Sequence, residues 1–204
     1  MPISKGYGYT VKPLFGNADK EVIVRHKNNT KDLNIDPDTS NVGGGICSGI
    51  TTAWLVMFLN DNQSAYPAQF EENFEVTRFQ GAYFKELHGK TPDHIEKMDK
   101  VLDSRLRELN RQQQRLTSGL SLPTASKWGA YLSIWGHAVG IGKAGNKYYI
   151  MDPNFGLFVY NSKSDFLADV QTLVEARAAR KKQNSSAKFG AIFFDQSKGL
   201  GSKK

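Results

Sequence analysis

The sequence predicts an α+β fold, in which a mainly helical N-terminal half packs on a C-terminal antiparallel β-sheet. Three observations predict it. The segment that begins at Cys47 has the pattern of a buried helix, residues 66–117 continue with apolar side chains at helical spacing, and from Leu120 onward short runs of glycine, aromatic and β-branched residues take over. A chain of 204 residues suits one sizeable domain with its own core.

The N-terminal region is expected to differ from the domain that follows it. Residues 1–40 are rich in glycine, asparagine and aspartate and predict an arm that is laid on the domain or is partly mobile. One alternating run, Glu21–His26, predicts a short strand within the arm. The domain itself is expected to span residues 41–195, and a polar, glycine-rich tail to span residues 196–204.

The glycine run Gly43–Gly45 leads into Cys47, the only cysteine of the chain. Ile50, Trp54 and Phe58 share one helical face, and further apolar residues surround it, so a buried helix should begin at Cys47. The unpaired N–H groups and the positive dipole end of such a helix favour a thiolate or an oxyanion, and they lower the pKa of a thiol. The alternative is that Cys47 is a small buried hydrophobic residue.

Two further helices are predicted before the sheet. Residues 66–87 form an aromatic-rich stretch, and residues 91–116 carry an apolar stripe at three- and four-residue steps. His88 and His94 flank the break between them without paired ligands nearby, so neither a metal site nor a cofactor is expected. The strands predicted after them are Ala138–Gly142, Lys147–Asp152 and Gly156–Tyr160, followed by a helix from Ser164 to about Lys182 and a buried strand Phe189–Phe194.

The first two of these strands bring a histidine and an acid together, because His137 opens one and Asp152 closes the next. A turn centred on Ala144-Gly145 would place His137 directly opposite Asp152. A turn centred on Gly145-Asn146 has better type II′ chemistry and pairs His137 with Asn154, which leaves Asp152 two positions away on the same face. In both registers a carboxylate can orient the imidazole, although a purely structural strand-end pair is the alternative.

A thiol at a helix N-terminus and a histidine oriented by an acid are the groups that thiolate activation needs. The segments Gly45–Gly49 with Trp54, Gly136–Ile141 and Tyr149–Gly156 together resemble the YopT/AvrPphB family of papain-like cysteine proteases, which bacteria deliver as effectors. The resemblance covers about residues 41–160 and implies a papain-like arrangement of the α+β fold.

The resemblance also implies roles for four residues. Cys47 would be the nucleophile, His137 the general base and then acid, and Asp152 the partner that orients the histidine. Asn41 would donate its side-chain amide to the oxyanion hole together with the backbone N–H of Cys47. The implied activity is cleavage of a peptide bond in a target-cell protein through a thioester acyl-enzyme, with no cofactor.

Other functions remain open at this point. The same triad could serve an amidase, a peptidoglycan peptidase or an acyltransferase, because one thioester mechanism supports them all. A basic, non-catalytic interaction module is the third possibility. The expected partners of a protease are its protein substrate and either a secretion chaperone or an immunity protein.

The formal charge of +7 permits non-specific attraction to nucleic acid or anionic membranes, but no recognised nucleic-acid motif accompanies it. No segment has the roughly 20 apolar residues of a membrane span, and no lipidation signature is found, so membrane association is not indicated. The N-terminus lacks the apolar region of a cleavable signal peptide. We therefore expect secretion by another route and action in the cytosol of a eukaryotic host or a rival bacterium.

Overall fold

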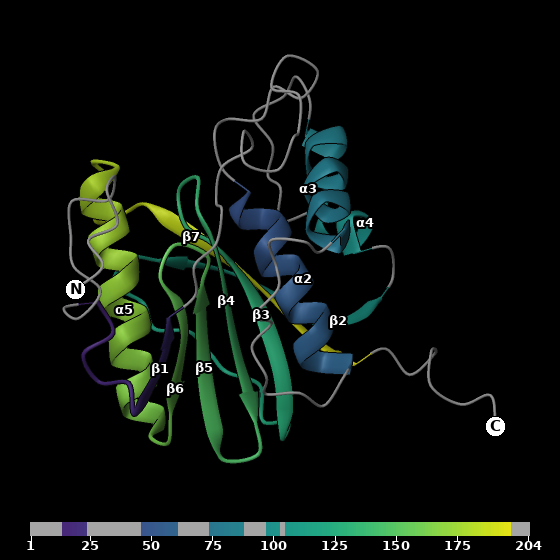
Figure 1. Cartoon of the computed structure of the whole chain (residues 1–204). Coiled ribbons are helices and arrows are strands. Elements are labelled where there is room, and N and C mark those ends of the chain that lie inside the picture. The colour runs from purple at the N-terminus through teal and green to yellow at the C-terminus, as the bar shows by residue number, and fades with distance from the viewer. Residues whose placement is uncertain (1–13, 24–45, 61–73, 88–96, 103–104, 197–204) are drawn as a thin grey trace.

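The computed structural model describes residues 14–23, 46–60, 74–87, 97–102 and 105–196. Within them one sheet of seven antiparallel strands has the order β1-β6-β5-β4-β3-β7-β2 (Figure 1). The strands are β1 (Lys20–Ile23), β2 (Leu106–Arg115), β3 (Lys127–Ser133), β4 (Ala138–Ala144), β5 (Lys147–Asp152), β6 (Gly156–Tyr160) and β7 (Lys188–Gln196).

Helices cover both faces of this sheet. They are α2 (Cys47–Asn60), α3 (Phe74–Leu87), α4 (Met98–Leu102) and α5 (Lys163–Arg180). Helix α2 contacts β3, β4 and β5, and α3 packs on α2. Helix α4 packs on α3 and β2, whereas α5 contacts β5 and β6 from the other side (Figure 1). Successive strand residues point to opposite faces. On β3, accordingly, Tyr131 packs in the cluster around α2, and Ala130 and Leu132 pack in the cluster around α5. The predicted α+β fold is confirmed.

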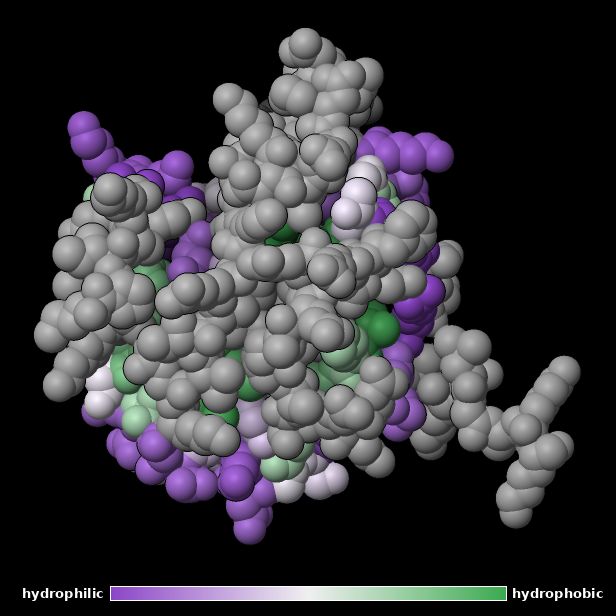
Figure 2. Space-filling model, in the orientation of Figure 1, coloured by the Kyte–Doolittle hydropathy of each residue, from purple (hydrophilic) through white to green (hydrophobic). Residues whose placement is uncertain are grey.

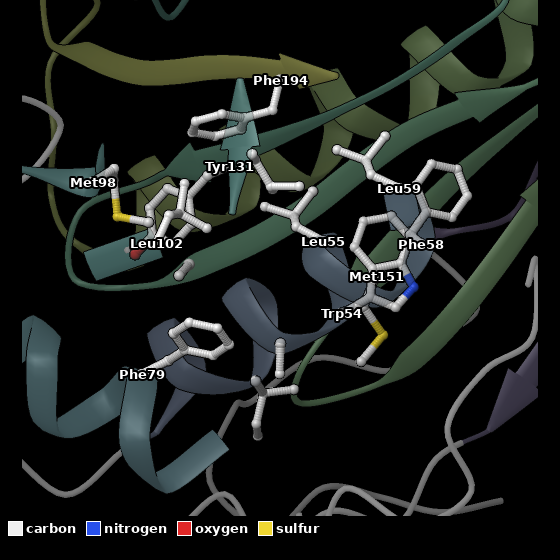
Figure 3. Close-up of a cluster of buried hydrophobic side chains, with 14 of the residues drawn as sticks. Trp54, Leu55, Phe58, Leu59, Phe79, Met98, Leu102, Tyr131, Met151 and Phe194 are labelled. Atoms are coloured by element: carbon white, nitrogen blue, oxygen red, sulfur yellow. The ribbon is translucent and has the colours of Figure 1, made fainter. Parts of the chain in front are cut away.

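The core on the α2 side is formed mainly by the helix that begins at Cys47. Trp54 stacks on Phe58 with ring centroids 4.8 Å apart, and Phe58 meets Tyr149 of β5 edge-on at 5.2 Å. Figure 3 shows Trp54 and Phe58 in one cluster with Phe79 of α3 and Tyr131 of β3. Because α2 is enclosed by helices on one side and the sheet on the other, it is buried nearly all round, as its sequence predicted.

The core on the α5 side includes part of the N-terminal region. Phe15 stacks on Phe158 with centroids 3.9 Å apart, and β1 pairs with β6. Asn17 donates its backbone N–H and its side-chain amide to the buried carboxylate of Asp169 on α5, at 3.1 and 2.6 Å. The strand predicted over 21–26 is therefore seen at Lys20–Ile23, and its later residues lie outside the described part of the chain.

The helix predicted over 91–116 is wrong in its second half. Met98 and Leu102 lie on the short helix α4, but Leu106–Arg115 is the edge strand β2, paired along its length with β7. This segment is polar, and its intrinsic preference for a helix is worth only about a few tenths of a kcal/mol per residue. Pairing with β7 in the sheet is enough to override so small a preference. The register shift between Glu108 and Asn110 marks a bulge, which also breaks the period-2 pattern that would have revealed a strand.

The helix predicted over 66–87 is seen at Phe74–Leu87, and its earlier residues lie outside the described part of the chain. The later predicted elements are present, and β3 was not predicted. This strand is buried on both faces, so its sequence shows no alternation. Helix α5 starts one residue earlier than expected, because Ser162 is its N-cap and accepts from the N–H of Asp165 at 3.3 Å.

In the view of Figure 2, hydrophilic side chains of the described residues gather at the lower left and along the right margin. None of the described helices has the length and apolar character of a bilayer span.

Two glycines let α2 lie directly on β4. A Cβ added to Gly140 would lie 2.5 Å from Cε3 of Trp54, and one added to Gly142 would lie 2.6 Å from Cε1 of Phe58. We expect Gly140→Ala to lower the free energy of unfolding by about 1–3 kcal/mol, because Trp54 and its helix must move. Chemical denaturation measures this change.

A matched control is Gly81→Ala on α3, where an added Cβ meets nothing within 4 Å. This substitution should instead stabilise the protein by up to about 1 kcal/mol, through helix propensity. If Gly140→Ala proved as stable as the wild type, the close packing of Trp54 on β4 would be contradicted.

Candidate active site

Cys47 is the first residue of α2, as predicted, and its side chain is half-buried. The first intrahelical hydrogen bond runs from the N–H of Ile50 to the carbonyl of Ile46 at 3.1 Å. The N–H groups of Cys47, Ser48 and Gly49 therefore precede the helix's own ladder and point out of its N-terminal end. This end of the helix favours negative charge on the thiol.

The hairpin that carries His137 and Asp152 uses the second of the two predicted registers. Gly140 pairs with Met151 and Ala144 with Lys147, so the turn is centred on Gly145-Asn146. Gly145 has a φ of 59°, a conformation that glycine adopts without strain. The register centred on Ala144-Gly145, with His137 directly opposite Asp152, is wrong.

Asp152 nevertheless reaches the histidine from its diagonal position. Nε2 of His137 lies 3.1 and 3.2 Å from the two carboxylate oxygens, and Asp152 has no solvent exposure. The backbone N–H of Asn154 donates to the same carboxylate at 2.8 Å, which holds it in place. Asn154 also contacts the ring directly, because its Nδ2 lies 3.1 Å from Nε2. His137 therefore has two neighbours from the end of β5, the buried acid and the amide.

The thiol and the imidazole meet between the helix and the sheet. The Cys47 side chain hydrogen-bonds with that of His137 and accepts a further hydrogen bond from the backbone N–H of Ala138. Thr51, one helical turn after Cys47, donates to the carbonyl of Ala138 at 3.1 Å. Both backbone groups of Ala138 thus bind α2, which fixes the start of the helix beside the start of β4.

The charges of this pair stabilise each other. Burial opposes ionisation of the Cys47 thiol, but the hydrogen bond and positive charge of His137 outweigh it, so the pKa of Cys47 lies below its ordinary value. Burial likewise opposes the charged imidazole, yet Asp152 and Cys47 together raise the pKa of His137 to about 9. Cys47 and His137 are therefore poised as a thiolate–imidazolium pair between the lowered pKa of Cys47 and the pKa of about 9 of His137.

Two proteins of known structure share this fold, although no protein-family model and no curated protein matches the sequence. The Pseudomonas avirulence protein AvrPphB aligns with a TM-score of 0.52 and 16% identity over 82% of this chain and 100% of its own. PatoxP, a cysteine protease-like domain of the Photorhabdus asymbiotica toxin PaTox, aligns with a TM-score of 0.54 and 15% identity over 96% of this chain and 58% of its own. The chain has the fold of these two proteins. The α+β arrangement that the sequence resemblance implied, with Cys47 at the start of a helix packed on an antiparallel sheet, is thus present.

Part of the expected oxyanion hole can be placed. The backbone N–H of Cys47 lies at the start of α2 beside the thiol, whereas Asn41 lies outside the described residues. Tyr83 on α3 also interacts with the charge of Cys47. Burial and that charge raise the pKa of Tyr83 to about 12, so its phenol is neutral near pH 7. No group of three or more metal-ligating side chains occurs among the described residues, and His88 and His94 are not part of them.

Several residues that support the start of α2 at Cys47 were not found from the sequence. Gln80 on α3 is 2% exposed, and its Oε1 accepts from the N–H of Gly49 at 2.7 Å. Tyr131 on β3 donates to Oγ of Ser48 at 3.1 Å. Together they satisfy polar groups at the buried start of α2 and hold it against α3 and the sheet. The one available signal was the set of polar residues Ser48, Thr51 and Thr52 within an otherwise apolar helix.

Proposed function

We propose that the protein is a papain-like cysteine endopeptidase that acts as an effector or toxin on a protein of a target cell. The observation that carries this proposal is the chain of contacts from Cys47 to His137 to Asp152, built at the N-terminus of a buried helix. The fold shared with an avirulence protein and with a cysteine protease-like domain of a toxin supports it. Action in the cytosol of that cell is part of the proposal.

The geometry suits acyl transfer through sulfur. The Cys47 thiolate attacks the carbonyl carbon of the scissile peptide bond, and the C=O π electrons move onto oxygen. The N–H of Cys47 stabilises this oxyanion, with Asn41 as the proposed second donor. The His137 imidazolium protonates the leaving amine as the C–N bond breaks, and the carbonyl re-forms as a thioester. His137 then removes a proton from water, which hydrolyses the thioester and releases the Cys47 thiolate.

Cleavage can be tested in lysates, where many candidate substrates are present at once. Eukaryotic and bacterial lysates are each incubated with the wild type or with Cys47→Ala, and newly formed N-termini are labelled and identified by mass spectrometry. We expect a small set of new termini in one of the two lysates, with the wild type only. Termini that also appear with Cys47→Ala, or their absence from both lysates at neutral pH, would contradict the proposed protease.

A further inference from the structure

The turn that immediately precedes His137 has an unusual backbone. Ser133 of β3 pairs with Ala138 of β4, and residues 134–137 connect these strands with Trp135 and Gly136 at the centre. The N–H of Ile134 donates to the carbonyl of His137 at 2.9 Å. Trp135 has a φ of 47° and Gly136 a φ of 76°, so both central residues are left-handed, as in a type I′ turn.

Tryptophan is an unfavourable residue for this position. The first central position of a type I′ turn prefers asparagine, aspartate or glycine, and a bulky side chain at positive φ is strained. Such a conformation persists only where the surrounding structure holds it. The Trp135 ring packs edge-on against Phe189, with centroids 6.4 Å apart. The ring also packs against the cluster on the α5 side, so these contacts hold the side chain. They do not bind the carbonyls of Ile134 and Trp135 in the turn.

Arg177 of α5 binds those peptide groups. Its side chain is buried, with the residue 5% exposed, and its Nε and Nη2 donate to the carbonyls of Ile134 and Trp135 at 3.3 and 3.2 Å. Nη2 also lies 3.9 Å from the place where a Cβ on Gly136 would be. Arg177 forms no ion pair with any residue of the described chain. A buried guanidinium without a carboxylate is costly, so these carbonyl contacts are its main compensation.

The ladder of β4 begins at Ala138, so His137 lies at the junction of the turn and the strand. The turn therefore sets the direction in which the Cα–Cβ bond of His137 leaves the backbone. Arg177 belongs to α5, whereas Cys47 belongs to α2 on the opposite face of the sheet. The hydrogen bonds that link Arg177 to the site thus go to the backbone of the turn before His137.

We propose that Arg177 is a positioning residue for His137: its guanidinium holds the strained Trp135-Gly136 turn in the left-handed form that directs the imidazole toward Cys47. This inference rests on the proposed function, in which His137 activates the Cys47 thiol. It gives α5, which contacts none of the reacting groups, a role in the chemistry on the other side of the sheet.

The test measures how fast Cys47 reacts with iodoacetamide as a function of pH. Arg177→Met keeps the apolar stem but loses both hydrogen bonds. We expect its alkylation rate at pH 6 to fall about tenfold, because the fraction of Cys47 present as thiolate falls when His137 is turned away. Adding Trp135→Asn should restore most of the rate, because Asn-Gly forms a type I′ turn unaided. Arg177→Lys, which cannot bind both carbonyls with a planar fork, should give an intermediate loss if Arg177→Met does not fold.

Val174→Ala is the matched control, since Val174 is buried on the same helix in the cluster on the α5 side. It should lower the thermal midpoint without changing the alkylation profile. Two results would overturn the positioning role. One is an unchanged alkylation profile in the folded Arg177 variants, and the other is a loss of alkylation rate in Val174→Ala as large as in those variants. If wild-type Cys47 itself reacts like an ordinary thiol at pH 6, the proposed function fails, and that result is distinct from the other two.

Discussion

His137→Gln should reduce peptide-bond cleavage to the level of Cys47→Ala, a loss on the order of 10⁶-fold if it follows other catalytic triads. Without the imidazole, the Cys47 thiol keeps the burial that raises its pKa and loses the hydrogen bond and charge that lower it. The thiolate is then scarce at neutral pH, and no acid remains to protonate the leaving amine. Rates of substrate cleavage and of iodoacetamide modification at pH 6 measure the two effects separately.

Glutamine is a better replacement than alanine because of Asp152. This carboxylate has no solvent exposure, and His137→Ala would remove its side-chain partner, which in buried ion pairs costs about 3–5 kcal/mol. A glutamine amide can donate to it instead. The double variant of Cys47→Ala and His137→Gln serves as the control, since two residues that act as one unit should lose no more together than either loses alone. A larger loss in the double variant would indicate that His137 acts independently of Cys47.

The second large effect is expected for Asp152→Asn, in both rate and pH dependence. Asp152 raises the pKa of His137 from 6.5 to about 9, together with Cys47. Because the folded-state pKa lies above the ordinary value, the contribution of the charged ring to stability is fully present below pH 6.5 and is lost as the pH rises through about 9. Asp152→Asn should therefore shift the alkaline limb of the rate profile to lower pH. It should also reduce the contribution of the charged His137 ring to folding stability at pH values below that limb.

At the pH optimum we expect at least about a tenfold loss for Asp152→Asn, since the histidine is less well oriented and its charge less stabilised. The loss should stay below the roughly 10⁴-fold of a serine triad, because a thiolate–imidazolium pair already exists before attack. Stopped assays across the pH range give both quantities. An alkaline limb that stays near pH 9 in Asp152→Asn would show that another group sets it.

Asn154→Ala is the comparison, because Nδ2 of Asn154 lies 3.1 Å from Nε2 of the same ring. It should cost less than Asp152→Asn, since the amide carries no charge. In the Asp152→Asn background its cost should rise, because it is then the remaining partner in this cluster, and a double-mutant cycle measures that coupling. If Asn154→Ala were the more damaging change in the wild type, a Cys-His-Asn arrangement would be favoured.

The parts of the fold that were predictable have a local chemical signal. The helix at Cys47 followed from apolar periodicity, and the β4–β5 hairpin from turn residues between β-branched runs. The strand at 106–115 had no such signal, because its polar residues are held in the sheet by β7, some 80 residues later. The choice between the two hairpin registers depended on a shift of one residue in the turn, which the turn chemistry of Gly145-Asn146 favoured correctly.

The candidate site divides in the same way. Cys47, His137 and Asp152 could be proposed because each lies at the end of an element and carries a reactive group. Gln80 and Arg177 could not be proposed, because their partners are backbone groups. Gln80 accepts from the N–H of Gly49, and Arg177 donates to the two carbonyls before Gly136. Every residue has such backbone groups, so the sequence does not show which of them are bound. Asn41, proposed from the resemblance alone, lies outside the described residues and stays a prediction.

The edge strand β2 also bears on how the protein behaves at high concentration. An exposed strand edge is a template on which another chain can assemble, and long, flat, apolar edges aggregate. Here the bulge between Glu108 and Asn110 twists the edge, and Arg107 and Arg111 lie along it in ion pairs with Asp195 and Glu108. Two copies aligned edge to edge would have to flatten the bulge and remove these ion pairs from water. β2 is thus the last strand at one edge of the sheet, and it lacks the apolar pattern that would promote fibrillar stacking.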